Sequence, residues 1–348
     1  MKRILFIGPA PTRIGGVAIH IQRLSWLLRD QFLFDYIDEA RGREIGYYNI
    51  RSLNLLHYFQ KIWKADIVHI HSGVFILRIL HIFFAKFLLR KVVVVSVHHD
   101  LAVEGKIGIT RYLLKHCNCA ILDSQKIYDS VFVNNSRCIY RMMPAFLPPI
   151  VEKENPLPDL VETWIKNVRK DTKSVLMCSS SYSIGEYNGV DLYGNDMSLD
   201  AVQKLNEQQD NRHFYLLMLL HNSDKNPDTL KNYQDKVEHD LKDNVLLETT
   251  PMSFVKIMKA SDIVLRPTNT DGDSITVREA LYFGKAMVAS DCAERPEGAI
   301  VFKTRNLHDY CDKILYSIEK KENEEKRVPF DYKSFYKECY ENSCGIRK

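Results

Sequence analysis

Several features that mark other classes of protein are scarce or missing in this sequence of 348 residues. Its eight cysteines include no C-x-x-C pair, so reduced thiols in a cytoplasm are the expected state. The first apolar run, Ile4–Ile7, is too short for the core of a signal peptide. The most apolar stretch, residues 74–89, has 13 apolar residues in 16 and falls short of the roughly 20 that cross a bilayer. No membrane-spanning segment is therefore predicted.

The composition is that of a globular protein, with 45% hydrophobic, 26% charged and 11% aromatic residues. The length favours two domains of roughly 100–200 residues each. The charge is uneven: residues 1–150 have 20 Lys and Arg against 10 Asp and Glu, or +10, and residues 151–348 have 28 against 34, or −6. The cations of the basic half are not clustered with aromatic residues in a known module, so no nucleic-acid partner is expected.

Short apolar runs that alternate with helix-length segments predict the fold class. Such runs are typical of parallel strands covered on both faces, so we expect an α/β protein with doubly wound sheets. Five prolines within residues 144–158 indicate a linker. We therefore predict one domain over residues 1–148 and a second over 149–329, with a closing helix within 330–348 that returns to the first domain. The predicted strands include Ile4–Ile7, Asp66–Ile70, Val92–Val97, Ser174–Cys178, His213–Leu220 and Asp262–Leu265.

A glycine-containing loop, GPAPTRIGGV, follows the first predicted strand. Gly15 and Gly16 stand directly before a helical pattern, where backbone amides can approach an anion at the positive end of the helix dipole. The spacing is not G-x-G-x-x-G, and no acidic residue closes a second strand in the manner of a dinucleotide site, so a nicotinamide cofactor is disfavoured. A tight turn that requires glycine remains an equal alternative.

Histidines mark the ends of two further predicted strands of the first domain. His69 and His71 alternate in DIVHIHSG, so both rings are expected on one face, and His98, His99 and Asp100 end the strand of VVVSVHHDL. Such residues can bind zinc, but nothing else in this half completes a hydrolase site. We expect no metal, and either a polar active-site rim or a structural role for these rings.

The most specific pattern lies in the second half, in SDIVLRPTNTDGDSITVREALYFGKAMVASD, residues 261–291. A predicted strand leads to a polar loop, and Ser274 stands where a helix N-cap is expected. The amides of Ser274, Ile275 and Thr276 at this helix start suit phosphate oxygens. Glu279, one turn further on, suits the vicinal hydroxyls of a ribose, with a capped helix bearing solvated acids as the alternative.

Together these motifs resemble those of GT-B glycosyltransferases of family four, which are retaining enzymes that use nucleotide sugars. The resemblance rests on GGVAIHIQRL after the first strand, DIVHIH, the strand ending at His98, the proline-rich linker and DGDSITVREALYFGKAMVASD. It covers the order and spacing of motifs over about 300 residues. Segments such as PAFLPP and ERPEG look most like members that build surface polysaccharides.

The resemblance implies a GT-B architecture, in which two Rossmann-like domains face a central cleft, the first binding the acceptor and the second the donor. The acidic motif of the family has two glutamates separated by seven residues, and here Asp271 and Glu279 take those positions. The match implies that Asp271 lies near the donor-sugar hydroxyls and that Glu279 binds the ribose. It also implies that Gly15 and Gly16 lie at the donor phosphates and that His98 lies beside the reacting sugar.

Two departures from the family pattern concern the donor. The first acid is Asp271 rather than a glutamate, and its side chain is one methylene shorter. The family also places an Arg and a Lys after the first strand of the second domain to neutralise the diphosphate, whereas this chain has CSSSYSIGEYNGVDL there. Arg266 and Arg13 are the two candidates for a substitute cation.

The sequence thus predicts a metal-independent, retaining glycosyltransferase that needs no cofactor beyond its nucleotide-sugar substrate. The expected acceptor is a glycan or lipid-linked glycan of surface-polysaccharide biosynthesis, with His69, His71 and His99 as acceptor-side candidates. The basic first domain and segment 74–91 suit an anionic membrane surface, with a buried helix as the equal alternative. We expect a cytoplasmic protein, with peripheral binding to the inner membrane face as one option. A nucleotide-sugar epimerase or phosphorylase on the same fold, and a non-catalytic nucleotide-sugar-binding subunit, remain alternatives.

Overall fold

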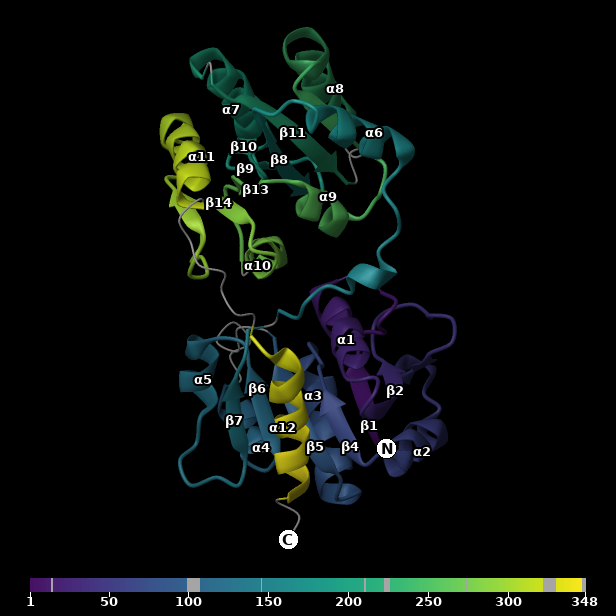
Figure 1. Ribbon diagram of the computed structural model, residues 1–348. Coiled ribbons are helices and arrows are strands. Elements are labelled where there is room, and N and C mark those ends of the chain that lie inside the picture. The colour runs from purple at the N-terminus through teal and green to yellow at the C-terminus, as the bar shows by residue number, and fades with distance from the viewer. Residues whose placement is uncertain are drawn as a thin grey trace. The chain divides into compact units, whose positions relative to one another are not determined.

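The computed structural model describes residues 1–13, 15–98, 107–144, 146–209, 211–221, 226–272, 274–321 and 330–345. The chain divides into two compact units, one of Met1–Pro148 with Phe330–Lys348 and one of Pro149–Pro329. Each unit is an α/β domain built around a parallel sheet (Figure 1). The two units are described separately.

The first unit has a seven-stranded sheet in the order β3-β2-β1-β4-β5-β6-β7, and every neighbouring pair is parallel. The chain starts inside the sheet and adds strands toward both edges, which is the doubly wound arrangement. Ligands in such sheets bind beyond the carboxyl ends of the strands. The strands are β1 (Lys2–Gly8), β2 (Phe32–Asp38), β3 (Tyr48–Asn49), β4 (Ile67–Ile70), β5 (Val92–Val97), β6 (Cys119–Leu122) and β7 (Ile139–Met142).

Helices cover both faces of this first sheet. One face is covered by α1 (Gly16–Leu27) and by α12 (Tyr332–Gly345) at the end of the chain. In α12 the buried residues Tyr336, Cys339, Tyr340 and Ser343 recur at spacings of three and four, which places them on one stripe that faces the core. The other face is covered by α2 (Leu55–Lys64), α3 (Phe75–Ile82), the π-helix η2 (Phe83–Leu88), α4 (Ile107–Leu114) and α5 (Gln125–Val131).

The second unit has a six-stranded parallel sheet in the order β12-β11-β8-β13-β14-β15. Its strands are β8 (Ser174–Ser181), β11 (His213–Leu220), β12 (Val245–Glu248), β13 (Ile263–Arg266), β14 (Ala286–Ser290) and β15 (Ile300–Phe302), and a small hairpin joins β9 (Glu186–Tyr187) and β10 (Val190–Asp191). One face packs against α7 (Asn195–Gln208), α8 (Pro227–Lys236), η5 (Val237–Leu241) and α11 (Leu307–Lys321). The other face packs against α6 (Asp159–Val168), α9 (Phe254–Ala260) and α10 (Ile275–Tyr282).

The apolar segment 74–91 forms α3 and η2, and it is neither wholly buried nor able to span a bilayer. Ile82 and Ala85 are buried in the first core, whereas Ile76, Phe83 and Leu88 are exposed. Among the described residues, no helix combines the length and the hydropathy that a membrane span requires. The segment therefore has a core side and a solvent side.

Candidate functional site

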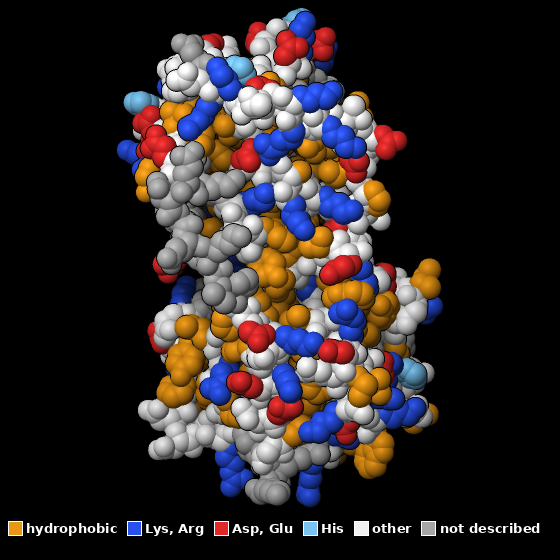
Figure 2. Space-filling view, in the orientation of Figure 1, with side chains coloured by type: hydrophobic (Ala, Val, Ile, Leu, Met, Phe, Trp, Pro, Cys, Tyr) orange, Lys and Arg blue, Asp and Glu red, His pale blue; other side chains and the backbone are white. Residues whose placement is uncertain are grey.

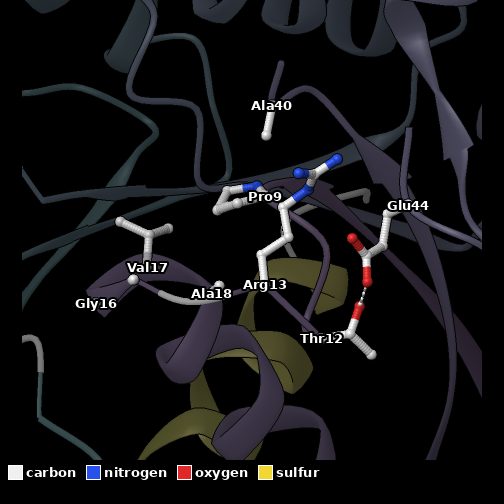
Figure 3. Close-up of a pocket in the computed structure, with 9 residues that line it drawn as sticks. Pro9, Thr12, Arg13, Gly16, Val17, Ala18, Ala40 and Glu44 are labelled. Carbon is white, nitrogen blue, oxygen red and sulfur yellow. Dashed lines mark hydrogen bonds between the residues drawn. The ribbon is translucent and has the colours of Figure 1, made fainter. Parts of the chain in front are cut away.

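The loop between β1 and α1 lines a pocket of about 610 Å³ in the first unit (Figure 3). Gly15, at the N-cap of α1, has φ +147° and ψ 152°, a conformation that favours glycine. No side chain caps α1, and its first turn has no acidic residue. The first amides of a helix have no partner within the helix. The start of α1 at Gly16 therefore has the features of an anion site.

Arg13 lines the same pocket, but its charge is already paired. Its Nη2 donates to Asp38 Oδ2 at 2.7 Å, and Asp38 is fully buried at the end of β2. Burial opposes ionisation of Asp38, but hydrogen bonds from Arg13, the Ala10 amide and Asn49 outweigh it and lower the pKa of the carboxyl. An acid does end the second strand, β2. Asp38 nevertheless lacks the open oxygens that a ribose requires. The Arg13–Asp38 pair has no net charge, which makes Arg13 a poor candidate for the diphosphate cation.

His69 has a structural environment in the core of the first unit. Its side chain is fully buried, with Nδ1 hydrogen-bonded to the Tyr340 hydroxyl and Nε2 to the Ser96 hydroxyl, both at 2.8 Å. These bonds tie β4 to β5 and to α12. Burial lowers its pKa well below the ordinary value, so the ring is neutral at pH 7. Both ring nitrogens are used, and neither is open to an acceptor.

His71, His98 and His20 form a cluster beyond the carboxyl ends of β4 and β5, and the ring centroid of His71 lies 4.0 Å from that of His69. His71 Nδ1 is hydrogen-bonded to His98 Nε2 at 3.0 Å, and one ring nitrogen from each of the three residues lies within 4.8 Å of the others. His71 is buried, and its Nε2 has no hydrogen-bond partner among the described residues. His99 lies outside the described residues. His20, which the sequence analysis did not single out, comes from the first turns of α1, where it follows the glycine pair.

The buried histidines predict a loss of stability in acid. Burial lowers the pKa of His69 and His71 below the ordinary 6.5, so below that pH the unfolded chain binds protons that the folded chain does not. As the pH is lowered, the free energy of unfolding should therefore fall by up to about 1.4 kcal/mol per pH unit for each such histidine. Urea unfolding between pH 7.5 and 5.5 measures this slope. His69→Gln, which does not titrate, should flatten it, and an unchanged slope in that variant would contradict the assignment.

The family resemblance places an Arg and a Lys after the first strand of the second unit, in the segment that leads to the start of α7. The predicted strand Ser174–Cys178 continues through the serines at 179–181, which belong to β8, and the β9–β10 hairpin follows. Asp191 then accepts hydrogen bonds from the amides of Tyr193, Gly194 and Asn195 at 2.8, 2.9 and 3.1 Å. A carboxylate of the chain thus occupies the helix start that follows the first strand of this unit. A phosphate could bind these amides only if Asp191 moved away.

The start of α10 is different, because among the described residues no acidic side chain lies in its first turn. Ser274 occupies the N-cap position, as predicted, but its side chain makes no capping hydrogen bond. The amides of Ile275 and Thr276 open the helix, where they have no partner within it. Glu279 lies one turn further on and is only 6% exposed. Asp273 lies outside the described residues.

Beside α10, two arginines bind the carboxylate of Asp271. Arg266, at the end of β13, donates through Nε to Oδ2 at 3.0 Å and through Nη2 to Oδ1 at 3.2 Å. Arg295, from the loop after β14, donates through Nη1 to Oδ2 at 2.9 Å. Burial opposes ionisation of Asp271, but the two arginines outweigh it and lower the pKa of the carboxyl. The three side chains have a net charge of +1, and Arg295 was missed because only the fold brings it to Asp271.

The hydrogen-bonding capacity of Asp271 is full. Its oxygens also accept from the Gly272 amide at 3.1 Å and the Thr268 hydroxyl at 3.4 Å, so five donors share about four lone-pair positions. The side chain of Arg266 is 14% exposed and that of Arg295 only 2%. The side chain of Asp271 is 11% exposed, so Arg266 and Asp271 both reach solvent and Arg295 is buried beside them.

Comparisons with known proteins identify the fold. No family model and no curated protein matches the sequence. The solved structures that match over nearly the whole chain include HepE of Anabaena in complex with UDP (15% identity, 99% of this chain and 94% of that one, TM-score 0.61), a glycosyltransferase from Rickettsia africae (13%, 99% and 93%, 0.62), and the catalytic domain of starch synthase IV from Arabidopsis thaliana (11%, 99% and 99%, 0.59). At these identities the likeness shows the fold alone, and the chain has the GT-B fold, with two Rossmann-like α/β domains.

Proposed function

We propose that this protein is a glycosyltransferase that moves a sugar from a nucleotide-sugar donor to a glycan or lipid-linked glycan acceptor, with retention of configuration, in surface-polysaccharide biosynthesis. The observation that carries the proposal is the start of α10, where the side chain of the N-cap residue Ser274 makes no capping hydrogen bond and which lies beside a group of net charge +1. Similar structures support the donor class, because they include HepE in complex with UDP or UDP-glucose and starch synthase IV bound to ADP.

The donor is proposed to bind in the second unit. The amides of Ile275 and Thr276 would hold diphosphate oxygens at the positive end of α10, and Glu279 would accept from the ribose hydroxyls. Arg266 would supply the cation, since negative charge develops on the diphosphate as the glycosidic bond breaks. Asp271 is proposed to act through Arg266 as a positioning residue, because its own acceptor positions are occupied.

The first unit is proposed to bind the acceptor. His98 and His71 lie beyond the carboxyl ends of neighbouring strands, and we propose that His98 lies beside the reacting sugar. The amides that follow Gly15 and Gly16 suit a phosphate group. Retention requires that the acceptor hydroxyl attack the face that the diphosphate leaves, and the departing phosphate can take its proton. No protein nucleophile and no cofactor is needed for this step.

A thermal-shift screen of the full chain with UDP, GDP, ADP and their sugars tests the donor class. A ligand at about 100 times its dissociation constant should stabilise the protein by roughly 2.7 kcal/mol. Turnover with the stabilising donor and an acceptor extract then tests the reaction. A free epimer or sugar phosphate as product would favour the epimerase or phosphorylase, and binding without turnover would favour a non-catalytic subunit.

Transfer is expected to survive chelation. Backbone amides and Arg266 are proposed to stabilise the charge on the leaving diphosphate. EDTA should therefore leave the rate of donor turnover unchanged. The result that would overturn this is loss of activity in EDTA with recovery in zinc. His20, His71 and His98, whose nitrogens lie within 4.8 Å of one another, would then be the ligands.

A further inference from the structure

The outer sides of α2 and η2 form an exposed apolar surface, consisting of Leu56, Trp63, Phe83, Phe87 and Leu88. Leu56 and Trp63 are 71% and 70% exposed, and Phe83 and Leu88 are 50% and 56% exposed. The inner sides of the same helices are buried in the core, so these residues are not needed to pack the sheet. Exposed apolar side chains gathered on one surface are typical of an interaction site.

The apolar surface is continuous between the two helices. Leu56 and Trp63 of α2 line a pocket of about 490 Å³ together with Leu88 and Leu89. The rings of Phe83 and Phe87 lie 6.1 Å apart along η2. Figure 2 shows one edge of this surface, where hydrophobic side chains over α2 stand beside Lys and Arg.

A basic pocket of about 640 Å³ adjoins the apolar surface at Phe87. Its described lining contains no acidic residue, and it contains five cations: Lys86, Arg90, Lys91, Lys115 and Arg137. Lys91 Nζ donates to the carbonyl oxygens of Trp63 and Ala65 at 2.6 and 2.9 Å, which holds this cation against the apolar surface. Together the apolar surface and the basic pocket pair exposed aromatic rings with concentrated positive charge.

The basic pocket is separate from the candidate site. Lys91 directly precedes β5, Lys115 lies just before β6, and Arg137 lies just before β7, so the pocket is at the amino ends of these strands. The glycine loop and His98 follow the carboxyl ends of β1 and β5. The excess of positive charge extends along the sequence, because between Glu44 and Asp100 there are seven Lys or Arg and one acid, Asp66.

We propose that the apolar surface and the basic pocket together dock the protein on an anionic lipid bilayer. Trp63, Phe83 and Phe87 would enter the headgroup region, where aromatic rings are favoured. Arg90, Lys115 and Arg137 would bind lipid phosphates, whereas Lys86 and Lys91, which donate to oxygens of the chain, would add positive charge. The anionic charge of the bilayer complements five cations without an acid, and its hydrocarbon boundary complements the apolar surface. The proposal deepens the proposed function by placing the first unit where a lipid-linked acceptor is found. Binding to the bilayer does not itself require sugar transfer.

Flotation of the full chain with phosphatidylglycerol–phosphatidylcholine vesicles tests the proposal. The protein should bind these vesicles, bind pure phosphatidylcholine weakly, and lose affinity as salt rises. Lys115→Glu with Arg137→Glu should lower the partition coefficient about 25-fold or more, since each cation contributes about fivefold. Trp63→Ser should lower it about tenfold.

Matched variants control for charge and hydrophobicity alone. Lys231→Glu with Lys337→Glu changes the net charge by the same amount as the pocket variant. Lys231 lies on α8 of the second unit, and Lys337 lies on α12, which covers the other face of the first sheet. Leu160→Ser is the control for Trp63→Ser, because it removes a side chain of the second unit that is 65% exposed. These control variants should bind anionic vesicles as strongly as the unchanged protein does. Equal loss in the controls, equal binding to both kinds of vesicle, or a dimer that Trp63→Ser dissociates in sedimentation would overturn the proposal. Absence of transferase activity would leave vesicle binding intact, so the two proposals fail separately.

Discussion

Gly194→Ala is expected to destabilise the second unit by about 2–5 kcal/mol and to weaken nucleotide binding. Gly194 has φ +68°, and a Cβ built on it would lie 2.1 Å from the Pro267 carbonyl oxygen and 2.9 Å from the carbonyl carbon. Backbone atoms cannot rotate away as a side chain can, so one of the two loops must move. Pro267 begins the loop that carries Thr268 and Asp271, and its displacement should therefore disturb the arginine pair.

Gly189→Ala supplies the matched control for Gly194→Ala. Gly189 has φ +76°, but a Cβ built there meets nothing within 4 Å. Its substitution should cause only the conformational cost of the left-handed region, about 1–2 kcal/mol, and leave nucleotide affinity unchanged. Urea unfolding and calorimetry on both variants make the comparison. Equal losses in the two variants would show that the Pro267 contact yields without cost.

The fold class could be predicted because the central strands are continuous apolar runs. β5, with the sequence VVVVSV, is buried at every position, and such strands occur in parallel sheets with both faces covered. The closing helix could be predicted from its tyrosines, which recur on one face. The GT-B fold that the resemblance implies is confirmed by the solved structures.

The second strand, β2, could not be predicted from local pattern. In FLFDYID the charged Asp35 interrupts the apolar run, and only Phe32, Ile37 and Asp38 are buried. Asp35 is tolerated because Lys61 of α2 donates to it at 2.6 Å, and Asp38 because Arg13 does so at 2.7 Å. Both partners lie about 25 residues away in the sequence. The strand is thus stabilised by contacts that exist only after folding.

The sequence predicted the strand and the helix that flank the acidic motif, but it did not predict the side-chain contacts of Asp271. Ser274 does stand at the start of α10, and Arg266 does end β13. The sequence could not show that Asp271 is enclosed by two arginines, because Arg295 lies 24 residues further along the chain and reaches it from the loop after β14. The same holds for His20, which α1 brings to His98 and His71.

Asp271→Asn is expected to weaken binding of the nucleoside diphosphate about tenfold and to lower kcat as well. A neutral amide cannot replace a carboxylate between two guanidinium groups, so Arg266 loses the partner that orients it, and a hydrogen bond to a charged group contributes about 1.5–3 kcal/mol. Arg266→Ala should have a similar effect. The double variant should be hardly weaker than either single variant, because the two substitutions remove one interaction. Calorimetry with the free diphosphate, beside turnover of the intact donor, measures both quantities.

Glu279→Gln completes this test, because Glu279 is assigned to the ribose and not to the arginine pair. It should also weaken diphosphate binding, by about tenfold or more, but its effect should add to that of Asp271→Asn. The family resemblance leads to a different expectation, in which Asp271 contacts the sugar directly. In that case Asp271→Asn would lower turnover and leave the affinity for the free diphosphate unchanged. That result would remove the positioning role of Asp271, whereas coupled losses with Arg266→Ala would establish Arg266 as the cation that faces the leaving group.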